Sequence, residues 1–136
     1  GKRLLIVGQF EDFLAAGLAR YPGADTYYFP YSPFYRPNEE QLGAIPRIVQ
    51  RYETVLFCLA NYNSLEILKT LEDSGKRIYV VSTLTPVYLR EVPGVKSGVA
   101  VYGTNIACFQ AGIAVLSGDY EPEGMLPINF LHNSTP

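Results

Sequence analysis

Five short apolar runs, separated by segments with helical spacing, constrain the fold of this chain more than any other feature. The runs are rich in aliphatic, β-branched and aromatic residues, and each has the length of a buried strand. They recur at intervals of roughly 20–25 residues, which suits one strand and one crossover helix. The predicted strands are residues 3–10, 25–31, 53–60, 77–84 and 97–103. This alternation predicts right-handed βαβ units and a mostly parallel five-stranded sheet.

The segments between the runs have the apolar periodicity and the boundaries of helices. The clearest is 63–75, in which Leu65, Leu68 and Leu71 form one apolar face and Gly75 provides the stop. The nearly all-apolar helix over 105–116 is expected to be buried on most sides. The other predicted helices are residues 11–21, a helix capped by Asn38 that carries Leu42, Ile45, Ile48 and Val49, and a short helix over 85–94.

These elements predict a three-layer αβα sandwich of flavodoxin-like or Rossmann-like type. The chain has 136 residues, 48% of them apolar, which fits one domain, residues 1–136, around a single core. Residues 125–130 are expected to add a short edge strand, where Pro127 would cost no ladder hydrogen bond. Residues 131–136 form a polar tail.

Charge and composition exclude several classes of function. The formal net charge is −2 and no basic run occurs, so nucleic acid is not an expected partner. No apolar run approaches the roughly 18–20 residues of a membrane span. Two cysteines and one histidine in scattered places match no metal-ligand spacing, so no metal is predicted. Cys58 and Cys108 are expected to be buried thiols, with a disulfide or a reactive thiol as alternatives.

Ligands of parallel sheets gather at the carboxyl ends of the strands, so the residues there are the candidate site. The predicted rim, facing a ligand or another domain, consists of Gln9, Glu11, Asn61, Asn63, Thr104 and Asn105. The first strand is followed by GQFEDF, which lacks the glycines of a dinucleotide or phosphate loop and carries two acids that would repel phosphate. The sequence therefore predicts no nucleotide or flavin cofactor.

Two further groups of side chains have open alternatives. Tyr31, Phe34 and Tyr35 lie in a proline-rich loop, where they would pack locally, contact another domain or subunit, or stack on a ligand. Glu11 and Asp12 would complement the positive end of a helix or, as the alternative, form the carboxylate pair of a small hydrolase or phosphatase.

The end of the chain carries the most specific motif. Residues 99–130 read VAVYGTNIACFQAGIAVLSGDYEPEGMLPINF. They resemble the C-terminal domain of glycoside hydrolase family 3, in which an apolar helix leads into a segment of the form Gly-(Asp/Glu)-x-x-Pro-x-Gly-(Lys/Arg)-Leu-Pro. Residues of this chain at the motif positions are Leu116, Gly118, Asp119, Pro122, Gly124, Leu126 and Pro127, with Met125 in the usual Lys/Arg place. The turn Tyr102–Asn105 is most similar to the bacterial β-N-acetylglucosaminidase branch.

The resemblance implies a bacterial domain excised from a longer glycosidase, with a catalytic barrel in the same parent chain as its partner and carbohydrate at the interface. In that branch the acid/base dyad lies on the barrel, which implies that this domain supplies no catalytic residue. The segment before Gly1 would then decide between a cytoplasmic and an exported parent. The residues agree with a non-catalytic end, because Asp119, Glu121 and Glu123 sit in one Pro/Gly turn. The rival interpretation is a free-standing flavodoxin-like binding or interaction module.

Overall fold

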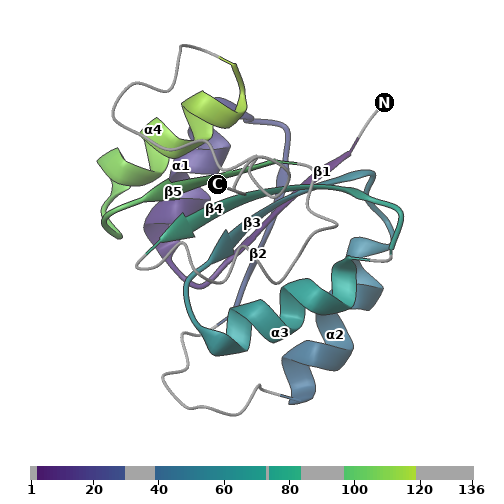
Figure 1. Cartoon of the computed structure of the whole chain (residues 1–136). Helices are drawn as coiled ribbons and strands as arrows, with labels where there is room; N and C mark the ends of the chain where they lie inside the picture. Colours follow the sequence, from purple (N-terminus) through teal and green to yellow (C-terminus); the bar gives the residue numbers. More distant parts are fainter. Residues whose placement is uncertain (1–2, 30–38, 73, 84–96, 119–136) are drawn as a thin grey trace, which may run out of the picture.

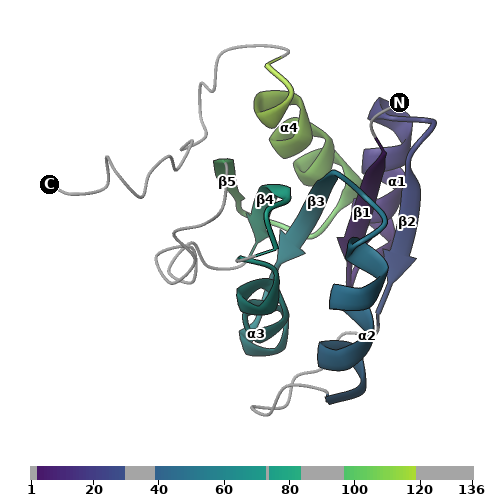
Figure 2. The same cartoon turned by 90° about the vertical axis from the view of Figure 1, so that its right-hand side faces the viewer.

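A five-stranded parallel sheet forms the centre of the protein in a computed structural model that describes residues 3–29, 39–72, 74–83 and 97–118. Its strand order is β2-β1-β3-β4-β5, and every pairing between these described strands is parallel. The strands are β1 (Leu4–Gly8), β2 (Asp25–Tyr28), β3 (Thr54–Leu59), β4 (Arg77–Thr83) and β5 (Ser97–Val101). Figure 2 shows this order across the sheet, from β5 on the left to β2 on the right. The predicted parallel sheet is confirmed.

Helices cover both faces of the sheet, as predicted. Figure 1 shows α1 and α4 on one side and α2 and α3 on the other. The helices are α1 (Glu11–Arg20), α2 (Glu39–Val49), α3 (Tyr62–Leu71) and α4 (Ile106–Leu116). The predicted helix 85–94 and the predicted edge strand 125–130 lie outside the described residues.

The two faces of the sheet build two separate cores because side chains alternate along each strand. On β1, Leu5 and Val7 belong to the core beneath α2 and α3, whereas Ile6 belongs to the core beneath α1 and α4. The predicted apolar face of α3 is confirmed, since Leu65, Leu68 and Leu71 are all fully buried. The helix ends at Leu71, four residues before the predicted stop at Gly75, which lies instead in the connection to β4 with a φ of +80° that favours glycine.

The expectation that the helix over 105–116 would be buried on most sides is wrong. Within α4 only Phe109, Gly112 and Ile113 are buried, while Ile106 remains 40% exposed. The helix lies on the outer layer and contacts the sheet and α1, so only one side of it is covered. A helix that is apolar on all sides can therefore still lie in the outer layer of this fold. None of the helices within the described ranges is long and apolar enough to cross a membrane.

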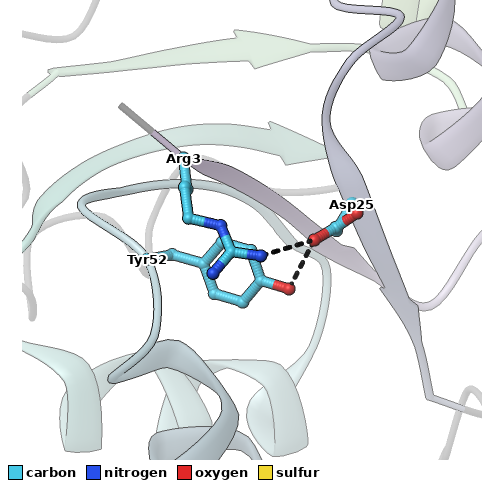
Figure 3. A network of polar contacts seen from close by, with 3 residues as sticks. All are labelled: Arg3, Asp25 and Tyr52. Atoms are coloured by element: carbon cyan, nitrogen blue, oxygen red, sulfur yellow. Dashed lines mark hydrogen bonds and ion pairs between the residues drawn. The ribbon is translucent and has the colours of Figure 1, made fainter. Parts of the chain in front are cut away.

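A small polar network joins the amino ends of three strands (Figure 3). The Tyr52 hydroxyl donates a hydrogen bond of 2.7 Å to Asp25, and the Arg3 guanidinium lies 3.9 Å from the same carboxylate oxygen. The guanidinium also lies over the Tyr52 ring, 5.3 Å from its centroid. Hydrogen bonding to Asp25, with smaller effects of burial and of the Asp25 charge, raises the pKa of Tyr52 above 10.0.

Alkaline pH is expected to remove the contribution of Tyr52 to stability. A pKa that is raised on folding stabilises the fold below the unfolded-state pKa, and this contribution is lost as the pH rises through the folded-state pKa. The free energies of unfolding of the wild type and of Tyr52→Phe should therefore differ at about pH 8 and converge at an alkaline pH above the raised pKa of Tyr52. Denaturant titrations at both pH values test this. Tyr102→Phe is the control, and a Tyr52→Phe difference that is constant with pH would contradict the prediction.

Candidate functional site

The carboxyl edge of the sheet contains a topological switch point at β1. From β1 the chain runs through α1 to β2 on one side, and β3 lies on the other side of β1. The helices α1 and α2 cover opposite faces of the sheet. The carboxyl ends of β1 and β3 therefore lie between one helical layer and the other. Open parallel sheets bind their ligands at such points.

Gln9 follows directly after β1 at this switch point and is only 2% exposed. Within the part of the chain that the structure describes, neither the amide nitrogen nor the amide oxygen of its side chain has a hydrogen-bond partner. A buried polar group without a partner costs about 1–3 kcal/mol of stability. Gln9 is therefore a buried polar side chain that the described residues leave unsatisfied.

The first turn of α3 supplies two more of the predicted rim residues. Asn61 caps the helix by accepting a hydrogen bond of 2.9 Å from the backbone N–H of Ser64, and the Ser64 hydroxyl oxygen accepts one from the Asn61 N–H. Asn63 is fully buried, and its amide donates a hydrogen bond of 2.9 Å to Gln41 in the first turn of α2. These bonds fix the starts of α2 and α3 against each other.

The end of β5 and the start of α4 form the other end of this edge. Asn105 caps α4 by accepting a hydrogen bond of 2.9 Å from the Cys108 N–H, and the Thr83 hydroxyl donates one of 2.7 Å to the Gly103 carbonyl. Thr104 is half-buried between them. Tyr102 is 76% exposed, so a large aromatic ring is presented to solvent here.

The two acids of this edge are neighbours on one helix. Glu11 and Asp12 occupy the exposed first turn of α1, where a negative charge favours the helix dipole. Neighbouring positions on a helix do not face each other, whereas retaining glycoside hydrolysis needs two carboxyl groups about 5–5.5 Å apart across the sugar. The described part of the edge thus offers amides, hydroxyls and an exposed ring for binding.

The structure brings some of the predicted residues together and leaves others apart. Asn61 and Asn63 share one turn, and Thr104 and Asn105 share another, while Gln9 follows the end of β1 between the two helical layers. Sequence reasoning did not place Gln41 at the site, although its position in the first turn of a helix beside Asn63 was the available signal. Tyr31, Phe34 and Tyr35, like the acids of the 119–123 turn, lie outside the described residues.

An apolar cavity of about 370 Å³ lies at the opposite, amino edge of the sheet, between its strands and the last turn of α4. Its lining includes Leu56, Tyr79 and Ile113. Several polar groups at its margin are already engaged, because the Tyr21 hydroxyl is hydrogen-bonded to Ser117 and Arg3 contacts Asp25 and Tyr52. The carboxyl edge is therefore the better candidate site.

The cysteines are both free, and among the described residues no group of side chains could hold a metal ion. Cys58 is buried and Cys108 is half-buried. Burial raises the pKa of the Cys58 thiol and keeps it protonated. The predicted burial is therefore confirmed for Cys58 and incomplete for Cys108.

We expect an aromatic disulfide reagent to modify Cys108 of the folded protein well before Cys58. The thiolate is the reactive form, and burial suppresses both the ionisation and the access of Cys58. Mass spectrometry of time points, with a denatured sample as reference, identifies the labelled thiol. In Cys108→Ser the folded protein should stay unlabelled over the same time. Equal labelling rates of the two thiols would refute this.

Two solved structures share this fold. One is a glycoside hydrolase family 3 β-N-acetylglucosaminidase from Paenibacillus sp. str. FPU-7, with a TM-score of 0.68 and 18% identity, covering 86% of this chain and 25% of that chain. The other is a family 3 exo-β-xylosidase, with a TM-score of 0.63 and 12% identity, covering 87% of this chain and 20% of that chain. No protein-family model matches the sequence, and no curated protein matches it either. The chain spans a quarter or less of the length of either enzyme, and the likeness shows a common fold.

Proposed function

We propose that this chain is the non-catalytic C-terminal domain of a family 3-like glycosidase, with β-N-acetylhexosaminides as the substrate class of the parent protein. The domain packs on a catalytic barrel of the same parent chain and contributes one wall of the site. The observation that carries this proposal is the fold match, in which 86% of this chain corresponds to a quarter of a β-N-acetylglucosaminidase.

The residues of the carboxyl edge support a binding role. The exposed Asn105 and the half-buried Asn61 and Thr104 carry hydrogen-bonding groups that suit sugar hydroxyls or the backbone of a neighbouring domain. The motif LSGDYEPEGMLP in residues 116–127 supports the same family, and the YGTN turn supports the N-acetylglucosaminidase branch.

The proposal is tested with the chain alone and with its parent protein. We expect the chain alone to fold without cleaving aryl β-N-acetylglucosaminides, because Glu11 and Asp12 are neighbours on one helix and do not face each other across a sugar. The parent protein should cleave them, and Asp12→Asn should leave its kcat unchanged. Turnover by the isolated chain that Glu11→Gln or Asp12→Asn abolishes would overturn the non-catalytic role. A parent gene that encodes no barrel would instead favour the free-standing binding module.

A further inference from the structure

We infer that Gln9 is the central hydrogen-bonding residue of a binding site for neutral carbohydrate at the carboxyl end of β1, an inference that rests on the proposed function. The starting observation is the enclosed Gln9 carboxamide, which has no hydrogen-bond partner in the described residues. Buried polar side chains in folded proteins almost always have one, so an exception needs an explanation.

Gln9 lies at the same edge and on the same face of the sheet as two other buried carboxamides. Leu5 and Val7 of β1 pack in the core beneath α2 and α3, and strand alternation places Gln9 on that face. The helices α2 and α3 both start at the carboxyl edge, where Asn63 donates to Gln41. We call Gln9, Gln41 and Asn63 the amide corner.

The charges of the amide corner select the class of ligand. Its three side chains are neutral, and each carboxamide offers two N–H donors and one carbonyl acceptor. The charged side chains of the neighbouring first turn of α1 are Glu11 and Asp12, which are exposed and would oppose an anion. Hydroxyl groups both donate and accept, so a neutral sugar satisfies the free amide where a phosphate or a carboxylate does not.

The absence of a hydrogen-bond partner for the Gln9 amide among the described residues also bears on how a ligand reaches this buried side chain. Both amide atoms of Gln9 are closed to solvent, so a sugar reaches them through a local opening of the corner. The unpaired amide raises the free energy of the closed form, which makes the opening less costly. A sugar hydroxyl that pairs with the amide then favours the bound form over the closed one.

The first test is the thermal stability of Gln9→Met in this 136-residue chain. Methionine keeps the length of the side chain and removes the unpaired amide, so the melting temperature should rise by about 3–6 °C. Gln110→Met, on the exposed side of α4, is the matched control and should change it by less than about 1 °C. A lower melting temperature for Gln9→Met would overturn the inference, because the amide would then contribute to stability instead of costing it.

The second test is the titration of the chain with N-acetylglucosamine and with xylose, followed by the NMR signals of the Gln9 side-chain amide. We expect one of these sugars to shift them, and glycerol and glucose 6-phosphate to have no effect at equal concentration. Gln9→Met should weaken binding at least about tenfold, and Gln110→Met should leave it within about twofold. Binding that Gln9→Met leaves unchanged, or no binding of either sugar, would overturn the inference.

These outcomes are independent of the test of the proposed function. If the parent protein is a glycosidase but this domain binds no free sugar, the proposed function stands and only the Gln9 site is refuted. If the parent protein has no catalytic barrel, the proposed function is refuted, whatever the sugar titration shows.

Discussion

Phe109→Ala is expected to cost about 3–5 kcal/mol of the free energy of unfolding, which is the largest effect of a single substitution that we predict. The Phe109 side chain is fully buried. Its ring meets the Phe13 ring edge-on with centroids 5.4 Å apart, and it stacks on Phe10 at 6.0 Å. Truncation leaves a cavity between α4 and α1 and removes both aromatic contacts. Urea denaturation of both proteins measures the difference.

Tyr102→Ala is the matched control for this substitution. It removes an aromatic side chain from the start of the same β5–α4 connection, but Tyr102 is 76% exposed. Its stability should stay within about 0.5 kcal/mol of the wild type. Equal losses for Phe109→Ala and Tyr102→Ala would show that the α1–α4 layer does not hold the core in solution.

Gly112→Ala and Gly43→Ala are expected to change stability in opposite directions. Both glycines lie inside helices, so both substitutions gain about 1 kcal/mol of helix propensity. An added Cβ at Gly112 would lie 2.9 Å from Val101 and 3.3 Å from Val81, whereas at Gly43 it would meet nothing within 4 Å. Gly43→Ala should therefore stabilise the protein.

The difference between the two glycine substitutions isolates the close approach of α4 to the sheet. Overpacking of this kind costs about 1–3 kcal/mol, so the free energy of unfolding of Gly112→Ala should be lower than that of Gly43→Ala by about that amount. Parallel denaturation curves of the two variants and the wild type give this difference directly. If both variants were stabilised to the same extent, α4 would be free to move away from Val101.

The sequence pattern predicts the order and type of these elements well, because strand and helix periodicities are local properties. The predicted strand 77–84 is β4, Arg77–Thr83, and the predicted strand 25–31 is confirmed over Asp25–Tyr28. The apolar face of α3 is likewise readable from its own residues. Such features depend on the spacing of side chains within one element.

The arrangement at the carboxyl edge could be predicted only in part, because it depends on how different elements pack. Gln9 is predicted as a rim residue from its place after a strand, but nothing in its neighbours along the chain indicates that its amide is enclosed. The bond between Asn63 and Gln41 follows from the packing of α2 on α3. The exposure of Ile106 similarly reflects which side of α4 meets the sheet, which hydrophobicity does not determine.

The central pairing of the sheet also sets how the chain must fold. Leu4 of β1 pairs with Thr54 of β3. The segment between them contains α1, β2 and α2, so this pairing forms only when the ends of that long segment come together. A parallel sheet has no hairpin that can form first from residues close in sequence. Loop closure is unfavourable until those distant contacts are made, which slows folding relative to helical bundles of similar size. During synthesis, the edge of β1 that pairs with β3 therefore stays unpaired until β3 has left the ribosome.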